Sequence, residues 1–163
     1  MSEQSTIKRI GGYLHRVIPI VDNTGKVVQH VIAPFMVELK PKDILQIIVG
    51  ATLFAIPVGL TEETWILAQE LKMQKILLLG FLSVFFIALF VYFNYYRFNL
   101  KGYLSQYIKR VIATYTLSLV VVGILLTIIE KCPWGVDNIL AIKRIIITAF
   151  PASMAATISD TIK

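Results

Sequence analysis

The chain has 163 residues, of which 56% are hydrophobic and only 16% are Asp, Glu, Lys or Arg. Ordinary soluble domains carry about 25% charged residues, so this composition excludes an ordinary soluble domain and indicates a membrane protein. The formal net charge is +6, but Lys and Arg stand at the ends of apolar runs. That distribution argues against nucleic-acid binding, which needs basic residues gathered on one face, and it is typical of membrane topology.

The first 40 residues differ from the rest, and we predict that they form a cytoplasmic segment with a small β-hairpin. YLHRVIPIV and VVQHVIAPF are two β-rich runs on either side of the turn signal DNTGK. Pro19 should confine the first strand to an edge or a bulge, because proline donates no backbone hydrogen bond. An isolated hairpin is only marginally stable, so this one should pack on the membrane helices or on a neighbouring copy, and it could dock a protein partner.

Two histidines in the hairpin are candidates for a metal or pH-sensitive site. With a loop over residues 22–25, His15 faces Ile32 and His30 faces Val17, which places both imidazoles close together on one face of the hairpin. Two histidines without a nearby Cys or carboxylate make a weak metal site. We therefore expect surface or packing histidines, with a proton-sensitive contact as the alternative, and we predict no metal and no cofactor.

Residues 41–163 are predicted to form a bundle of four transmembrane helices. The spans cover residues 44–60, 76–96, 111–129 and 139–158. The second run contains no charged residue and exceeds the ~18 residues that mark a spanning helix. The third is rich in β-branched residues, but in lipid every backbone group must be satisfied internally, which favours a helix.

Prolines in the first span and charged residues in the fourth should change the length or the regularity of these two helices. Pro41 suits the first helical turn, and Pro57 should end or kink the first span. The fourth span reaches a sufficient length only if Lys143 and Arg144 lie inside it, so we expect it to be tilted, broken or half-exposed.

Between the first two spans, residues 61–74 form a short amphipathic segment. Thr61 is placed to cap a helix whose first turn holds Glu62 and Glu63, which is favourable at the positive end of the helix dipole. The following Trp65 and its apolar neighbours should enter the membrane interface. We predict a helix that lies on the membrane surface.

Lys and Arg counted outside the spans give the orientation. If both termini are cytoplasmic, eleven basic residues lie inside and five outside. The positive-inside rule therefore places the N-terminus and the C-terminus in the cytoplasm.

Small residues recur every four positions in the first and fourth spans. The rows are Ala51, Ala55 and Gly59 in the first span, and Ala149, Ser153 and Thr157 with Ala152 and Ala156 in the fourth. Such rows let membrane helices approach closely, so we expect these two helices to be partners and the protein to be a homo-oligomer. The alternative is a polar path, in which Pro151 frees a carbonyl and the hydroxyls of Ser153, Thr157 and Ser159 line a passage.

The remaining polar residues offer few sites for chemistry. Gln46 and Asn94 are the strongest polar groups of the confident spans, and neither titrates. Asp160 is expected to be a solvated helix end. Lys143 and Arg144 should anchor the helix at the interface, or alternatively form an outer ring of charge in an oligomer. No zinc-protease motif, phosphate loop or serine elbow is present, so we predict no catalytic residue and no enzymatic activity.

The stretch VELKPKDILQIIVGATLFAIPVGLTEETW, together with AFPASMAATISD, resembles an uncharacterised prokaryotic family of small integral membrane proteins. The resemblance implies a multi-pass protein of the inner cell membrane and brings no known activity. Fold class and composition together favour a small oligomeric channel-like or transporter-like protein. The alternative is a non-conducting structural or accessory subunit of a membrane complex.

Overall fold

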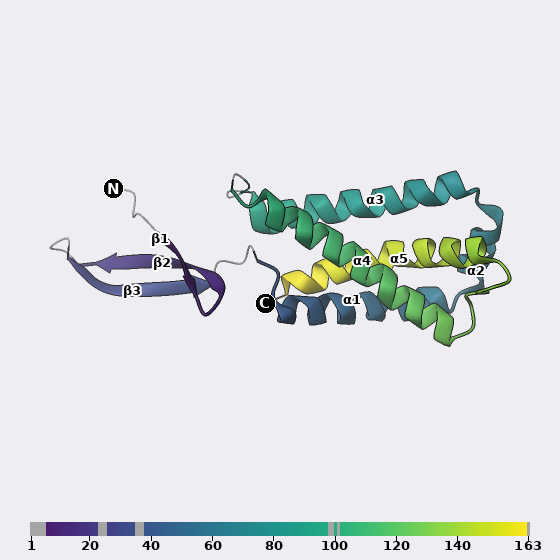
Figure 1. Ribbon diagram of the computed structural model, residues 1–163, viewed down its shortest axis with the longest axis horizontal. Coiled ribbons are helices and arrows are strands. Elements are labelled where there is room, and N and C mark those ends of the chain that lie inside the picture. Colours follow the sequence, from purple (N-terminus) through teal and green to yellow (C-terminus); the bar gives the residue numbers. More distant parts are fainter. Residues whose placement is uncertain (1–5, 23–25, 35–37, 98–99, 101, 163) are drawn as a thin grey trace. The chain divides into compact units, whose positions relative to one another are not determined.

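The computed structural model describes residues 6–22, 26–34, 38–97, 100 and 102–162 (Figure 1). The chain folds into two units, Met1–Leu39 and Lys40–Lys163. The first is a small antiparallel sheet and the second is a helical bundle with four long apolar helices. The predicted fold class, an all-α membrane bundle with a small N-terminal β-structure, is confirmed.

The sheet unit has three strands, in the order β1-β2-β3. Strands β2 (Tyr13–Val21) and β3 (Val27–Pro34) form the predicted hairpin, and β1 (Thr6–Ile10) was not predicted. Gly11 and Gly12 connect β1 to β2 with φ angles of 59° and 87°. Two positive φ angles are required at the centre of a tight type I′ turn, which explains the glycine pair.

The predicted hairpin register was wrong by two residues. His15 lies opposite Pro34, and His30 lies opposite Pro19. One residue of this shift arises because Val21 pairs with Val27 and not with Lys26, and the bulge between Ile20 and Val21 adds the other. The two histidines are therefore four residues apart along the strand direction and are not near neighbours. Strand β2 is the central strand of the sheet, so the strand that contains Pro19 is not an edge strand over its whole length. However, β1 pairs with β2 only over residues 13–17, so at Pro19 the strand β2 has one neighbour.

The helical unit contains four candidate membrane spans and two shorter elements. The spans are α1 (Pro41–Gly59), α3 (Met73–Val91), α4 (Leu104–Ile128) and α5 (Asn138–Thr161). The short helix α2 (Glu62–Glu70) lies between α1 and α3 in the chain, and a turn of π-helix, η1 (Tyr92–Tyr96), continues α3. Large apolar side chains such as Leu53, Phe81 and Ile128 are more than 60% exposed on the outer faces, as expected where lipid surrounds a bundle.

Helix α5 is the central helix of the bundle and packs against α1, α3 and α4 (Figure 1). Three neighbours leave room only for small side chains, and Ala149, Ala152, Ser153, Ala156 and Thr157 are all buried. The predicted pairing of the first and fourth spans is confirmed, since α1 and α5 form the most extensive contact of the bundle. The helix is continuous through Pro151, so a break, one of the three alternatives expected for the fourth span, is absent.

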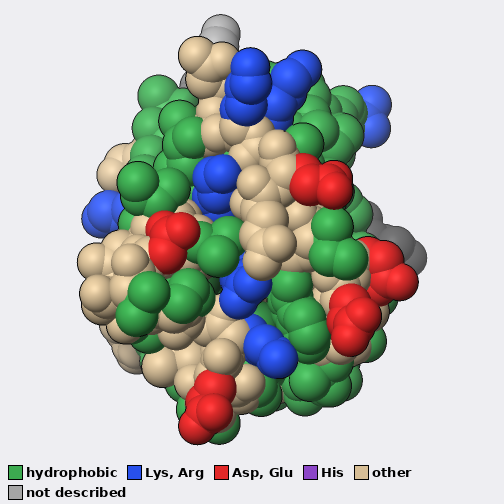
Figure 2. Space-filling view, turned by 90° about the vertical axis from the view of Figure 1, so that its right-hand side faces the viewer, with side chains coloured by type: hydrophobic (Ala, Val, Ile, Leu, Met, Phe, Trp, Pro, Cys, Tyr) green, Lys and Arg blue, Asp and Glu red, His purple; other side chains and the backbone are tan. Residues whose placement is uncertain are grey.

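Helix α2 lies at one end of the bundle, where acidic and basic side chains gather among apolar ones (Figure 2). The predicted helix is confirmed, but the predicted cap is not. The Thr61 hydroxyl donates to the carbonyl of Val58 at 2.8 Å and lies 2.7 Å from the hydroxyl of Thr64, and it does not cap a backbone N–H of α2. Carbonyls in the last turn of α1 have no partner within their own helix, and this hydroxyl satisfies one of them. The Trp65 indole donates to the Gly59 carbonyl at 3.0 Å and also ties α2 to α1.

Candidate functional site

Three charged side chains are buried together at the end of the bundle where α1 begins and α5 ends (Figure 1). They are Asp43 of α1, Arg110 of α4 and Asp160 of α5, and we name them the charge triad. Their residues are 2%, 0% and 1% exposed. Ionised side chains are almost never fully buried unless they are paired, so the geometry of this pairing determines what the site can do.

Arg110 bridges the two carboxylates with separate nitrogen atoms. Its Nη2 donates to Oδ2 of Asp43 at 3.0 Å, and its Nη1 donates to Oδ2 of Asp160. Asp43 also accepts the backbone N–H of Lys40 at 3.1 Å, and so satisfies one donor in the first turn of α1. The charge triad thus joins three helices through one guanidinium group.

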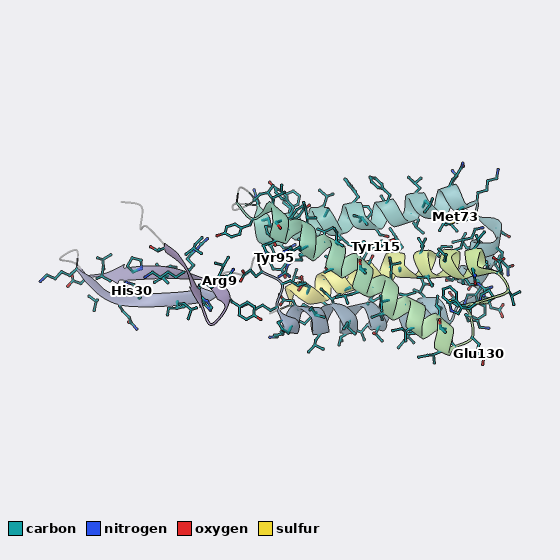
Figure 3. All side chains as sticks on the ribbon, in the orientation of Figure 1. Arg9, His30, Met73, Tyr95, Tyr115 and Glu130 are labelled. Carbon is teal, nitrogen blue, oxygen red and sulfur yellow. The ribbon has the colours of Figure 1, made fainter. Side chains whose placement is uncertain are left out.

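The end of α3 contributes an aromatic side chain to the same site. The Tyr95 hydroxyl donates to the backbone carbonyl of Asp160 at 2.8 Å, and the ring centroid of Tyr95 lies 4.3 Å from Cζ of Arg110 (Figure 3). A guanidinium over an aromatic face is attracted by the ring quadrupole, most strongly when both are removed from water. Tyr96 is fully buried beside it and packs edge-to-face on Tyr107. All four membrane helices therefore meet at the charge triad.

Two predictions are corrected by this arrangement. Asp160 was expected to be a solvated helix end, and it is an almost fully buried ion-pair partner. The third span was predicted to begin at residue 111, which leaves Arg110 outside it, but α4 begins at Leu104, so Arg110 lies nearly two turns inside the helix. The apolar run marks only the lipid-facing length of α4, and the helix itself continues beyond it.

Buried hydroxyl groups extend from the charge triad into the bundle. We name Thr114 and Ser118 of α4, with Ser153 and Thr157 of α5, the hydroxyl column; all four are at most 3% exposed. Arg110, Thr114 and Ser118 are spaced by four residues, so they share one face of α4 over about 12 Å at 1.5 Å per residue. Because α5 runs antiparallel to α4 and its Asp160 meets Arg110, the hydroxyls of the two helices lie at similar depths.

Each hydroxyl in the column donates to a carbonyl of its own helix. Thr114 donates to Arg110 at 2.9 Å and Ser118 to Thr114 at 2.8 Å. In α5, Ser153 donates to Phe150 at 3.0 Å and Thr157 to Ser153 at 2.7 Å. Such bonds satisfy the hydroxyl proton inside the membrane, and each hydroxyl oxygen can still accept a hydrogen bond.

The other predicted polar residues are not brought into the hydroxyl column. The Gln46 amide donates to the carbonyl of Ile162 at 2.5 Å, which ties the start of α1 to the end of α5. The Asn94 amide donates to Phe90 at 2.8 Å within its own helix and is exposed. Pro151 and Ser159 line an apolar groove between α1 and α5.

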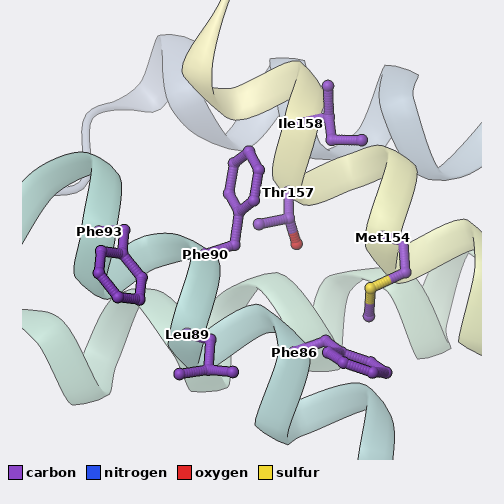
Figure 4. Close-up of a pocket in the computed structure, with 7 residues that line it drawn as sticks. All are labelled: Phe86, Leu89, Phe90, Phe93, Met154, Thr157 and Ile158. Carbon is purple, nitrogen blue, oxygen red and sulfur yellow. The ribbon is translucent and has the colours of Figure 1, made fainter.

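A second groove, of about 380 Å³, lies between α3 and α5 (Figure 4). Phe86 and Phe90 of α3 face Met154 and Ile158 of α5 across it. Thr157 also lines this groove, although its hydroxyl is engaged with the Ser153 carbonyl. Its apolar lining suits the acyl chains of lipid and offers no path for an ion.

Lys143 and Arg144 lie at the end of the bundle opposite the charge triad. The Lys143 ammonium donates to the carbonyl of Leu71 at 2.7 Å, and the Arg144 guanidinium donates to the carbonyl of Lys131 at 2.6 Å. Lys143 therefore binds the connection between α2 and α3, and Arg144 binds the connection between α4 and α5, both within one chain. Whether they also form a ring between copies stays a prediction.

No group of three or more His, Cys, Asp or Glu side chains that could hold a metal ion occurs among the described residues. The two carboxylates of the charge triad both accept hydrogen bonds from one guanidinium group, that of Arg110. Chemically, such a site can take up a proton on a carboxylate, since a proton needs no cavity. It resembles neither a nucleophile with its base nor a metal centre.

Cys132, in the connection between α4 and α5, should react slowly with thiol reagents. It is 8% exposed, and burial raises the pKa of its thiol more than the neighbouring Arg144 charge and Thr127 hydroxyl lower it. The thiolate is the reactive form, so maleimide labelling in detergent should still accelerate above the pKa of about 8.5 typical of a free cysteine. Mass spectrometry of labelling rates between pH 7 and 10 measures this, and a rate that levels off below pH 8 would contradict it.

Comparison with known proteins agrees with the helical architecture. The sequence profile of a family described as "Putative integral membrane protein (DUF2391)" matches residues 23–160. Neither a curated protein nor a solved structure matches the chain. The matched region includes nearly the whole of all four apolar helices and the complete charge triad. The chain therefore belongs to this family of integral membrane proteins.

Proposed function

We propose that the protein is a small channel-like or transporter-like protein without enzymatic activity, and that the charge triad is the place where it takes up a proton. The observation that carries this proposal is the burial of two carboxylates and one guanidinium inside membrane helices. Ionisable groups in such positions are costly, and they commonly mark ion or proton pathways in membrane proteins.

The charge balance of the triad supports a proton as the transported species. With both carboxylates ionised, the three side chains together carry a formal charge of −1, and ionised groups are costly to bury. A proton on Asp43 or Asp160 removes that charge without enlarging the site. The hydroxyl column then offers acceptors that continue from the triad into the bundle.

We further propose that both termini are cytoplasmic and that the protein lies in the inner cell membrane. An even number of spans puts the start of α1 and the end of α5 at the same end of the bundle (Figure 1). The larger share of Lys and Arg belongs to that side, as the positive-inside rule requires for the cytoplasm.

Proton flux into liposomes tests this function. Purified protein reconstituted with a trapped pH-sensitive dye should acidify the lumen when a potassium gradient and valinomycin impose a negative interior potential. Replacing Asp160 with Asn removes the titratable group but keeps its size, and it should lower the flux at least tenfold. The matched control is Glu63→Gln, because Glu63 is an exposed carboxylate on α2, and its flux should equal that of the wild type.

Two results would contradict the proposal. Wild-type flux no greater than that of empty liposomes would remove the conducting role. Wild-type flux that survives Asp160→Asn in a monodisperse protein would leave conduction standing and remove the triad from it.

The second candidate function is a non-conducting structural or accessory subunit of a membrane complex. Close helix packing favours it: the position of a Cβ built on Gly50 lies 2.5 Å from Cβ of Ser159, so α1 and α5 touch without a gap there. The hydroxyl protons of the column are also used within their own helices. Absence of wild-type flux in the same liposomes would favour this role.

A further inference from the structure

The two outer edges of the sheet unit differ in length and in charge. Strand β1 is five residues long and includes Lys8 and Arg9. Strand β3 is eight residues long, VVQHVIAP, and contains no Lys, Arg, Asp or Glu. Natural sheets protect their edges with short strands, charges, prolines and bulges, so β1 is a protected edge.

Strand β3 has protection only at its two ends. The bulge opposite Ile20 and Val21 lies at its start, and Pro34 is its last residue. Within the part of the sheet unit that the structure describes, β2 is the one strand that pairs with it. Val28, Val31 and Ile32 are 69%, 43% and 55% exposed. A long apolar edge with unpaired backbone groups is a ready template for another strand.

The chemistry of β3 favours a second copy of itself as that strand. An antiparallel pair of identical strands is related by a two-fold axis, so each residue contact occurs twice. Like charges placed opposite each other destabilise such a pair. Pairing β1 with itself would bring Lys8 and Arg9 against their own copies, whereas β3 has no charged side chain to oppose.

We propose that β3 of one copy pairs antiparallel with β3 of a second copy, giving a six-stranded sheet in the order β1-β2-β3-β3-β2-β1. The short, charged β1 strands then form both outer edges and prevent further growth, so the assembly closes as a dimer. This inference does not depend on whether the bundle conducts protons.

Cysteine cross-linking in native membranes tests the pairing. The background is full-length Cys132→Ser, and single cysteines are placed at each position from Val27 to Ile32 and, as the matched scan, from Thr6 to Ile10. Mild oxidation should give a cross-linked dimer with one sharp maximum in β3, because only residues next to the two-fold axis oppose their own copies. The β1 scan should give no dimer. Absence of a β3 maximum, or equal cross-linking in β1, would overturn the proposal.

A charge placed on the edge gives a second, independent measurement. Ile32→Lys adds a cation to β3, and Ile10→Lys adds the same cation to β1 at a side chain of similar exposure, 41% against 55%. Mass photometry in mild detergent should show at least a tenfold rise in the dimer dissociation constant for Ile32→Lys alone. A dimer that persists unchanged would assign dimerisation to another surface and refute pairing through β3.

Discussion

Replacing Arg110 with Met should lower the free energy of unfolding of the bundle by about 3–5 kcal/mol, the usual cost of removing one partner of a buried ion pair. The side chain is 0% exposed and bonds carboxylates from two other helices. Without it, Asp43 and Asp160 stay buried near each other, and one of them must take up a proton or the helix ends must separate. Met fills a similar volume, so lost packing contributes little to the expected effect.

Thermal unfolding in detergent, followed by tryptophan fluorescence, measures this loss. The matched control is Lys109→Met, because Lys109 is the adjacent cation on α4 and is exposed. Substitutions at such surface positions usually change stability by less than about 0.5 kcal/mol. An Arg110→Met protein as stable as the control would show that the two carboxylates are satisfied without the guanidinium.

A triple variant separates the structural role of the charge triad from its proposed transport role. Replacing all three members with apolar residues, Asp43→Leu, Arg110→Met and Asp160→Leu, removes every buried charge at once. Apolar replacement of a whole buried ion cluster is often neutral or stabilising, so most of the lost stability should return. About 1 kcal/mol should remain missing, because Asp43 also caps the backbone N–H of Lys40. Proton flux should stay absent in this stable protein.

The sequence contained a signal for the charge triad, although hydropathy alone did not reveal it. Each charged residue lies on a four-residue row of buried side chains in its own helix. On α1 the row is Asp43, Ile47, Ala51, Ala55 and Gly59; on α4 it is Arg110, Thr114, Ser118, Val122 and Leu126; on α5 it is Ala152, Ala156 and Asp160. Extending the small-residue rows by two steps in α1 and by one step in α5 would have identified Asp43 and Asp160 as inward-facing. These rows do not predict which charged side chains pair with each other. That pairing depends on how far each helix continues past its apolar run.

The same limit explains the other differences between prediction and structure. The four spans were predicted because about 20 apolar residues in lipid have few alternatives to a helix. Helix α4 begins seven residues before the predicted start at residue 111, since backbone helicity continues where hydropathy stops. Strand β1 was missed because Lys8 and Arg9 hide any alternation, and the Gly11-Gly12 turn was the one available clue. The hairpin register failed because the loop is one residue longer than predicted and because a bulge follows it. Both are set by local backbone geometry, which residue types specify weakly.

The substitution Gly50→Ala adds a single methyl group, and it should destabilise the bundle more than the same substitution at a glycine whose neighbours are flexible side chains. A Cβ at this position would lie 2.5 Å from Cβ of Ser159 and 2.9 Å from the backbone of both Ala155 and Ala156. Backbone atoms cannot rotate away as side chains do, so α1 and α5 must separate. Overpacking of this kind costs about 1–3 kcal/mol. That cost should exceed the gain of about 1 kcal/mol that alanine brings to a helix interior.

Gly123→Ala on α4 is the matched control, and it should change stability in the opposite direction. The nearest atom to its Cβ would be Cδ1 of Ile145, at an ordinary contact distance of 3.6 Å. Here the gain in helix propensity, up to about 1 kcal/mol, should remain. Thermal unfolding of the two variants in the same detergent compares them directly, and equal effects would refute the close approach at Gly50. Because α5 also packs on α3 and α4, it cannot move away from α1 without loosening those contacts, so the strain at Gly50 should be felt by the whole bundle.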